Sequence, residues 1–212
     1  MCLICFMRFF QKQKISYQSM SYKIFENIFD DDFSQFIKDN ARVYHPGRVG
    51  KRINLKQKNR SDSYLKDPNV LNLIDDRLYN VIYEDVKTVF GHDIKYREPY
   101  KVGYYDGENG GFYNLHTDDA RETKYRCISM VAALSDPEEY GGGILYFSNL
   151  NKEFKLKKNS AIVFDSSILH GVKPVTSGKR HVLISFFFND NGKTVRETLN
   201  PSLINNKHWD DQ

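Results

Sequence analysis

Three side chains in the second half of the sequence could together bind a metal ion. His116 and Asp118 are two residues apart, so their side chains leave the same face if this segment is an extended strand. His170, much later in the chain, could supply a third ligand from a neighbouring strand. The sequence therefore predicts a site of two histidines and one carboxylate.

A ligand set of this kind occupies one face of an octahedral ion and leaves the other positions open. The arrangement suits non-haem Fe(II), which can then bind a chelating co-substrate and O2, while zinc is the second reading. The spacing of His116 and Asp118 is a weak signal alone, because two polar residues at this distance arise on any solvent-facing strand. The interpretation depends on residues further along the chain.

A basic residue follows His170 at a characteristic distance. Arg180 lies ten residues beyond His170, after an expected turn at 176–178 and at the start of an apolar strand. The succession of His-x-Asp, a distant His and this basic residue resembles the Fe(II)- and 2-oxoglutarate-dependent dioxygenases, most closely their prolyl-4-hydroxylase-like branch. The resemblance covers roughly residues 95 to 190, and further segments that fit it are 104–107, 111–113, 141–147 and 159–165.

The resemblance implies a role for each of these residues. His116, Asp118 and His170 would hold iron, and Arg180 would pair with the distal carboxylate of 2-oxoglutarate. A guanidinium suits that task because its planar fork can bind a carboxylate bidentately. Lys179 is the rival, but strand alternation gives Arg180 the more uniformly apolar face, so we assign the role to Arg180.

Tyrosines near the triad are further candidates for cofactor binding. Tyr105 resembles the family's tyrosine whose hydroxyl also reaches the 2-oxoglutarate carboxylate. Compared with the family's spacing, one extra residue separates Tyr105 from His116 in this sequence, so Tyr104 stays an alternative. Tyr113 is three residues before His116 and hence on the opposite face of a regular strand, which makes it a packing aromatic or a pocket residue. The predicted cofactor-binding residues are Arg180, Tyr105 and Tyr113.

Length and composition bound the class of protein. The 212 residues suffice for one domain, and a net charge of +4 with a pI near 8.8 is too weakly basic to indicate nucleic acid. The odd set of Cys2, Cys5 and Cys127 does not suggest a disulfide framework, and no apolar run is long enough to span a bilayer. We expect a cytoplasmic protein that is not membrane-bound, and we make no prediction of its oligomeric state.

The chain divides into four expected parts. Residues 1–19 are expected to be a disordered or dispensable extension, and 20–93 an N-terminal helical support of the same domain. The core would span 94–190, and 191–212 would form a C-terminal tail, loosely ordered or packed over an edge. Short strands separated by turn residues indicate a sandwich or barrel. The resemblance makes this core a mostly β double-stranded β-helix, of the jelly-roll or cupin-like type, with flanking helices.

The segment 42–60 carries seven basic residues and no acidic one. A solvated loop and a mobile lid over the site, able to meet an acidic or extended substrate, are equally good readings of this composition. Contact with phosphates is a further option. The sequence leaves the role of this segment open.

The resemblance implies hydroxylation of an unactivated C–H bond. Fe(II) would be the cofactor, 2-oxoglutarate and O2 the co-substrates, and succinate and CO2 the co-products. Ascorbate is a candidate reductant. A prolyl or other amino-acid residue in a peptide or protein is the favoured substrate, and a small molecule is the second option. Two alternatives are a nucleic-acid oxidative demethylase, whose paired arginines have no match after Arg180, and a non-catalytic jelly-roll binding module.

Overall fold

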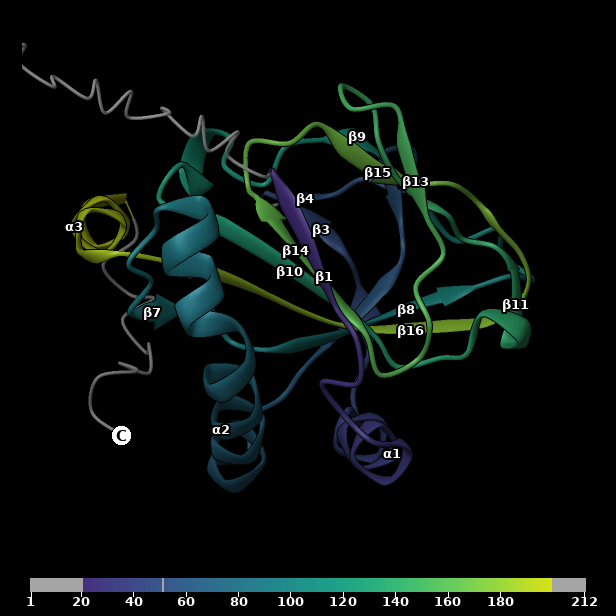
Figure 1. Ribbon diagram of the computed structural model, residues 1–212. Helices are drawn as coiled ribbons and strands as arrows, with labels where there is room; N and C mark the ends of the chain where they lie inside the picture. The colour runs from purple at the N-terminus through teal and green to yellow at the C-terminus, as the bar shows by residue number, and fades with distance from the viewer. Residues whose placement is uncertain (1–20, 51, 200–212) are drawn as a thin grey trace, which may run out of the picture.

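The structure is a computed structural model that describes residues 21–50 and 52–199, so the expected extension at 1–19 lies outside it. Two antiparallel sheets face each other, and helices cover the outer side of the larger one (Figure 1). The expectation of a mostly β domain with flanking helices is therefore confirmed. Within these ranges no helix is both long and apolar enough to cross a membrane.

The larger sheet is built around the long strand β16, with neighbours paired in the order β1-β14-β10-β16-β8-β6-β2 and with β7 and β11 also paired to β16. Its strands are β1 (Tyr22–Phe25), β2 (His45–Pro46), β6 (Ser61–Tyr64), β7 (Tyr96–Arg97), β8 (Lys101–Asp106), β10 (Ile128–Ala133), β11 (Tyr140–Gly142), β14 (Ala161–Asp165) and β16 (Val175–Phe188). The smaller sheet follows the order β13-β12-β15-β9-β5. It consists of β5 (Lys58–Asn59), β9 (Phe112–His116), β12 (Leu145–Phe147), β13 (Lys152–Phe154) and β15 (His170–Val172), and β3 (Arg48–Val49) with β4 (Arg52–Ile53) forms a separate ribbon.

Capping residues mark the starts of the first two helices. The helix α1 (Asp31–Asn40) starts after Asp30, whose carboxylate accepts a hydrogen bond from the backbone of Phe33. The helix α2 (Pro68–Asp85) is capped by Asp67 in the same way, and a π-helical turn at Val86–Phe90 continues it to Gly91, which has a φ of 71°. The helix α3 (Asp190–Leu199) follows β16, and short 3-10 turns occur at Arg121–Thr123 and Pro137–Glu139.

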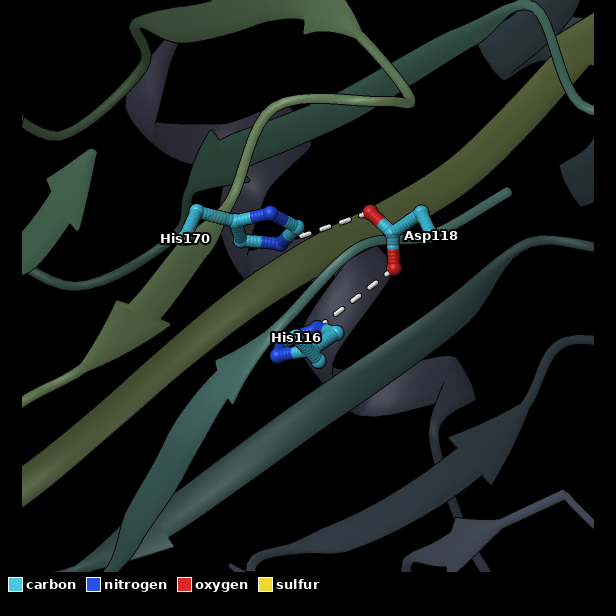
Figure 2. A group of neighbouring side chains, drawn as sticks. All are labelled: His116, Asp118 and His170. Atoms are coloured by element: carbon cyan, nitrogen blue, oxygen red, sulfur yellow. Dashed lines mark ion pairs between the residues drawn. The ribbon is translucent and has the colours of Figure 1, made fainter. Parts of the chain in front are cut away.

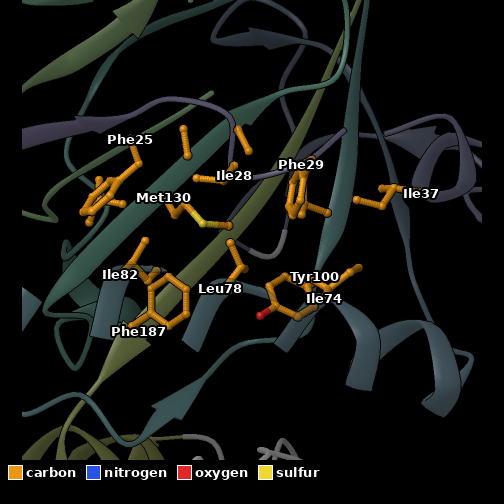
Figure 3. Packing of buried hydrophobic residues seen from close by; sticks show 14 of the residues in the cluster. Phe25, Ile28, Phe29, Ile37, Ile74, Leu78, Ile82, Tyr100, Met130 and Phe187 are labelled. Atoms are coloured by element: carbon orange, nitrogen blue, oxygen red, sulfur yellow. The ribbon is translucent and has the colours of Figure 1, made fainter. Parts of the chain in front are cut away.

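Alternation along the strands separates two apolar cores. On β16, Leu183 and Phe187 point outward and pack with the apolar faces of α1 and α2, for example Ile37 and Leu78 (Figure 3). Val182, Ile184 and Phe186 point the other way, into the space between the two sheets. The first core fastens the helices to the sheet, and the second forms the walls of the interior where the functional residues lie.

The structure corrects three local expectations. The turn expected at 176–178 lies within the continuous strand β16, where Gly178 takes a φ of 66° beside the carbonyl oxygen of Glu139. The C-terminal tail expected from residue 191 begins as the helix α3, packed by Arg196 against Tyr125 and Phe188. Residues 200–212 lie outside the described ranges.

The third correction concerns the basic segment 42–60. It contains β2 to β5, which extend both sheets, so it is not one continuous loop. Lys58 is 2% exposed and Arg60 is 8% exposed, so the end of the segment belongs to the interior. The end of the segment lies beside the predicted site, because β5 pairs with β9, the strand that ends at His116.

Candidate metal and co-substrate site

The three predicted metal ligands lie together at the ends of two paired strands. His116 is the last residue of β9, His170 is the first of β15, and the two are opposite each other in the register. Asp118 follows β9, held by a backbone hydrogen bond from its N–H to the carbonyl oxygen of Ser166 at 2.8 Å. Figure 2 shows the carboxylate between the two imidazoles, with one oxygen 3.5 Å from His116 Nε2 and the other 3.4 Å from His170 Nε2.

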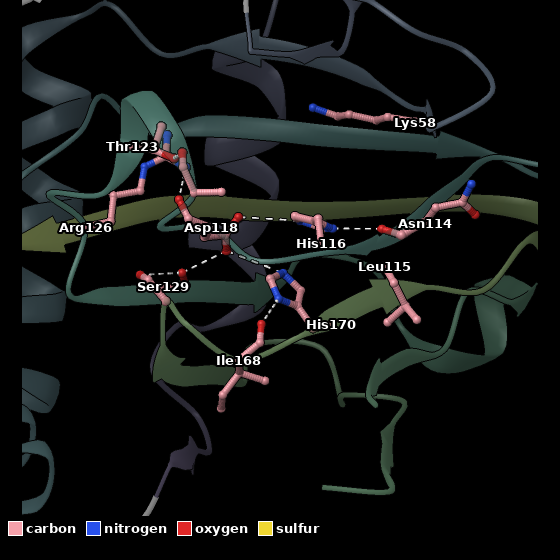
Figure 4. Close-up of polar contacts among 12 residues, drawn as sticks. Lys58, Asn114, Leu115, His116, Asp118, Thr123, Arg126, Ser129, Ile168 and His170 are labelled. Atoms are coloured by element: carbon pink, nitrogen blue, oxygen red, sulfur yellow. Dashed lines mark hydrogen bonds and ion pairs between the residues drawn. The ribbon is translucent and has the colours of Figure 1, made fainter. Parts of the chain in front are cut away.

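Backbone carbonyls fix the orientation of both imidazoles (Figure 4). His116 Nδ1 donates to the carbonyl oxygen of Asn114, and His170 Nδ1 donates to that of Ile168, each at 2.8 Å. In the neutral form of each ring the donating nitrogen carries the proton, so Nε2 is the atom that can bind a metal ion. Both Nε2 atoms lie toward Asp118, as a shared metal ion requires.

Polar neighbours also hold the carboxylate of Asp118. Ser129 Oγ donates to Asp118 Oδ2 at 2.8 Å and lies 2.9 Å from Ser166 Oγ, while Arg126 donates to the Asp118 carbonyl oxygen at 3.1 Å. Burial by itself raises the pKa of Asp118, but the attraction of His170 and His116 outweighs it and holds the pKa well below its usual range. The carboxylate is therefore ionised and ready to act as a ligand.

This donor set fits a divalent transition metal. Across the part of the chain that the structure describes, His116, Asp118 and His170 form the group of potential ligands that converges, with their ligand atoms within 4.8 Å of one another. Two imidazoles and one carboxylate on one side of an ion suit non-haem Fe(II), and these ligand types also bind zinc. The remaining coordination positions would face the interior between the sheets.

Arg180 is the predicted anchor for a carboxylate, and its surroundings fit that role. It is 5% exposed on the inner face of β16, and its Nε and Nη1 atoms are buried without a hydrogen-bond partner in the described part of the molecule. A buried guanidinium without a partner is costly, and a bound carboxylate would satisfy both donors. Lys179 is exposed to solvent instead, as strand alternation predicts for the neighbour of an inward-facing residue.

Space for the Arg180 side chain depends on a glycine. Gly143 takes a φ of 64°, and a Cβ atom built there would lie 3.0 Å from Arg180 Cδ. The left-handed backbone at this position favours glycine as well. The glycine-rich segment 141–147 therefore allows the neighbouring backbone to approach the guanidinium side chain.

The structure distinguishes between the two candidate tyrosines on β8. Tyr105 is opposite Arg180 in the β8–β16 register, is 1% exposed and accepts a hydrogen bond from Arg60 Nη1 through its hydroxyl oxygen at 3.0 Å. Tyr104 points to the other face, where its ring packs on His181 and Tyr44. Only Tyr105 of this pair therefore lies on the side of the metal ligands.

The expectation that Tyr113 lies on the opposite face from His116 is wrong. The two rings stack, with centroids 3.6 Å apart and an interplanar angle of 18°. The cause is an irregularity in the pairing of β9 with β15, in which three steps along β9 from Tyr113 to His116 match two steps from Val172 back to His170. Such a bulge rotates one residue out of the alternation and brings Tyr113 to the ligand side.

Sequence reasoning missed a buried charged group next to these tyrosines. Arg60 donates to Asp62 from Nε at 2.7 Å and from Nη2 at 3.2 Å, and Lys58 donates to the same carboxylate at 2.9 Å. Lys58 Nζ also lies 5.1 Å from the centroid of the Tyr113 ring. The available signal was the spacing of Lys58, Arg60 and Asp62 at every second residue, which places all three on one face of an extended segment.

Comparisons with known proteins agree with this geometry. Residues 100–189 match the family described as the 2OG-Fe(II) oxygenase superfamily. A PKHD-type hydroxylase of Colwellia psychrerythraea is 41% identical over 83 residues, which are 36% of this chain and 37% of that relative. The matched stretch thus covers well under half of the curated relative.

Solved structures show the same fold over most of the chain. A prolyl hydroxylase of Trichoplax adhaerens, in complex with a hypoxia inducible factor oxygen degradation domain peptide fragment, has a TM-score of 0.69 at 18% identity and covers 82% of this chain and 86% of its own. The viral collagen prolyl hydroxylase of Paramecium Bursaria Chlorella virus-1, as a 2OG complex, has a TM-score of 0.61 at 22% identity, with 79% and 95% covered. The expected double-stranded β-helix core is confirmed, and residues 100–189 match the sequence pattern of the 2OG-Fe(II) oxygenase superfamily.

Proposed function

We propose that this protein is an Fe(II)- and 2-oxoglutarate-dependent dioxygenase that hydroxylates an unactivated C–H bond, with succinate and CO2 as co-products. The observation that carries the proposal is the convergence of His116, Asp118 and His170 on the same interior that holds Arg180, whose Nε and Nη1 have no hydrogen-bond partner among the described residues. A metal site and a separate carboxylate anchor are the two parts that a chelating dicarboxylate co-substrate requires.

Each residue of the site has a defined task in this proposal. His116, Asp118 and His170 would hold Fe(II), which supplies the activation of O2 and the oxidative chemistry when it is bound. Arg180 would bind the distal carboxylate of 2-oxoglutarate, with the Tyr105 ring beside the guanidinium. The task of the protein is to orient these groups and to place the target carbon near the metal.

Aromatic rings shield the metal ligands from water. The rings of Phe164 and Phe147 pack edge-on against His170, with centroid distances of 4.8 and 6.2 Å, and both are buried. An apolar surrounding limits the access of water to a reactive centre and to the substrate. This wall favours a role in oxidation of a C–H bond over a metal site that only binds a surface ion.

The substrate that we propose is a prolyl or other amino-acid residue in a peptide or protein. The support is the likeness to relatives named PKHD-type hydroxylases and prolyl hydroxylases, one of them solved with a peptide fragment. Two segments that could line a peptide site, 42–60 and the turn at 109–112, contact each other, because Asn59 Nδ2 donates to the carbonyl oxygen of Asn109 at 2.7 Å. Action on a small molecule or nucleic acid has no comparable support.

Product analysis tests this proposal directly. The purified protein is incubated with Fe(II), 2-oxoglutarate, ascorbate and a library of proline-containing peptides, and peptides are examined by mass spectrometry for the gain of one oxygen atom. Oxygen-18 gas should supply that atom, and succinate should form in equal amount. No peptide oxidation and no succinate above the level of Asp118→Ala would contradict the proposal. A cytoplasmic location and the use of ascorbate stay predictions from the sequence.

A further inference from the structure

The interior between the sheets holds a second group of charged residues that the proposed chemistry does not use. We call it the inner charge cluster, and it consists of Lys58, Arg60, Asp62, Glu98, Lys101 and Arg126. Arg60 and Asp62 are buried, and Glu98, Lys101 and Arg126 are half-buried. Charged side chains at this depth are costly unless each one has a partner of opposite charge.

Both carboxylates of the inner charge cluster already have close cationic partners. Asp62 accepts hydrogen bonds from Lys58 and Arg60. Glu98 accepts two from Arg126, one to each carboxylate oxygen, and a further one from the Tyr125 hydroxyl. These two carboxylates are therefore engaged, and Lys101 is the cation of the cluster left over.

Lys101 makes only long-range contacts within the described part of the chain. Its ammonium lies 5.2 Å from the centroid of the Phe186 ring and 5.9 Å from that of Tyr64, and it forms no hydrogen bond or ion pair there. Burial lowers the pKa of Lys101 from its ordinary value, although Asp62 partly opposes this. A half-buried ammonium whose charge is disfavoured gains most from an arriving anion.

Lys101 and Arg126 contact the same aromatic ring, that of Phe186. The Arg126 guanidinium carbon lies 3.6 Å from the centroid of the Phe186 ring, and Arg126 also donates to the Asp118 carbonyl oxygen. Lys101 therefore shares an aromatic ring with a residue that contacts a metal ligand. Two contacts, through Phe186 and Arg126, thus connect Lys101 with the backbone of Asp118.

Lys101 is too far from Arg180 to share a single co-substrate carboxylate with it. On β8, Lys101 and Tyr105 point to the same face, opposite Ile184 and Arg180 in the register. Four residues of extended strand span about 13 Å. The inner face thus carries two separate cations, Arg180 and the Lys101 of the inner charge cluster.

We propose that Lys101 binds a carboxylate of the peptide substrate close to the residue that is hydroxylated, so that the enzyme selects acidic peptides. The inference rests on the proposed function and specifies its substrate class. A carboxylate at Lys101 would offset the excess positive charge of the inner charge cluster, where four cations face two carboxylates. Such a pair, formed away from bulk water, is stronger than one on the surface.

Binding rather than turnover tests this proposal. Protein loaded with Mn(II) and 2-oxoglutarate is incubated without O2 with a peptide library that has a fixed central proline and random flanking residues. The bound fraction should be enriched in Asp and Glu at one flanking position. Libraries with free and with amidated C-termini separate the two sources of the carboxylate, since enrichment of free over amidated ends would indicate the terminus.

Variants at position 101 test whether Lys101 causes the preference for acidic peptides. In Lys101→Met the acidic preference should fall about tenfold, as expected for loss of one charged partner at a partly desolvated site. Lys101→Arg should retain most of it, because the charge remains. Lys179→Met, which removes an exposed lysine of the same sheet, is the matched control. No acidic enrichment in the wild type, or equal enrichment in Lys101→Met, would overturn the inference.

One further arm separates this inference from the proposed function. Half-saturation by 2-oxoglutarate is measured in the wild type and in Lys101→Met by the anaerobic Fe(II) absorbance. Binding of 2-oxoglutarate in the wild type without any acidic preference would leave the dioxygenase intact and overturn only the role of Lys101. A large increase in the 2-oxoglutarate requirement of Lys101→Met would show that this lysine serves the co-substrate and would overturn substrate recognition. A wild type that binds no 2-oxoglutarate would contradict the proposed function itself.

Discussion

The guanidinium of Arg180 lies over the ring of Tyr105, with 4.9 Å between the guanidinium carbon and the ring centroid, and the two residues are paired across β8 and β16. Among the described residues, Arg180 Nε and Nη1 are buried without a hydrogen-bond partner, so the tyrosine ring is the group that supports this cation. The pair is the basis for proposing Arg180 as the carboxylate anchor.

The first prediction follows from that pair. Arg180→Ala should raise the 2-oxoglutarate concentration for half-saturation by roughly a hundredfold, because it removes the partner of a desolvated carboxylate. Arg180→Lys should recover part of the loss, since it keeps the charge but not the fork. The concentration is measured by titration of the Fe(II) protein, with Lys179→Ala as the exposed neighbouring control. Equal half-saturation in Arg180→Ala and the wild type would contradict the assignment.

A second prediction concerns the support of the metal ligands. Ser129→Ala removes the hydrogen bond to Asp118 Oδ2, so the carboxylate should be less well oriented and metal affinity should fall roughly 10- to 100-fold. Calorimetric titration with Co(II), a stable substitute for Fe(II), measures the affinity. Ser148→Ala, at an exposed serine of β12's end, should leave it unchanged. Unaltered affinity in Ser129→Ala would show that the serine has only a packing role.

A third prediction concerns stability at the interface between α2 and the larger sheet. Asp75 is fully buried and binds Arg97 at two nitrogens as well as the Tyr100 hydroxyl. Asp75→Ala should lower the free energy of unfolding by about 3–5 kcal/mol, because it leaves a buried guanidinium unpaired. Urea denaturation measures this, and Asp76→Ala, one residue along on the exposed face of α2, is the control. A loss equal to that of the control would refute the structural role.

A fourth prediction concerns pH. The carboxylate of Asp165 and the thiol of Cys127, both close to the imidazole, raise the pKa of His92 from 6.5 to about 9. A raised pKa in the folded state stabilises the fold fully below the unfolded value, near pH 6.5, and this contribution is lost as the pH rises through about 9. Since His92 and Asp165 are 3.7 Å apart and partly exposed, the contribution should stay below about 1 kcal/mol.

His92→Gln tests the pH prediction. The melting temperature of the wild type should exceed that of the variant by more at about pH 6 than at about pH 10, where neither form is stabilised by a charged imidazole. Asp165→Asn should reduce the same difference. A gap between wild type and His92→Gln that is independent of pH would contradict the account.

Much of the site could be predicted because its signals are local in the sequence. The two-residue spacing of His116 and Asp118 and the alternation that separates Arg180 from Lys179 depend only on strand geometry. The start of α1 and the start of α2 could be placed because Asp30 and Asp67 are capping residues, whose preference is intrinsic. These features need no knowledge of tertiary contacts.

The features that sequence reasoning missed depend on contacts between distant segments. The side of Tyr113 is set by a bulge against β15, which no pattern within β9 reveals. The strands of the basic segment have two residues each, too short for a period to be visible, and the burial of Lys58 and Arg60 requires their partner Asp62. The helix α3 has a mostly polar sequence with few apolar positions, so the sequence resembles that of a loosely ordered tail.

The central claim is that His116, Asp118 and His170 form one Fe(II) site that accepts 2-oxoglutarate. The most direct measurement is an anaerobic titration of the metal-free protein with Fe(II) and then 2-oxoglutarate, following the weak visible charge-transfer band of the chelate. The account predicts a saturable band in the wild type and in His45→Ala, a control variant at an exposed histidine. It predicts no band in His116→Ala, provided that the circular dichroism spectrum shows this variant to be folded. A folded wild-type protein that gives no band, or a His116→Ala variant that gives the full band, would contradict it.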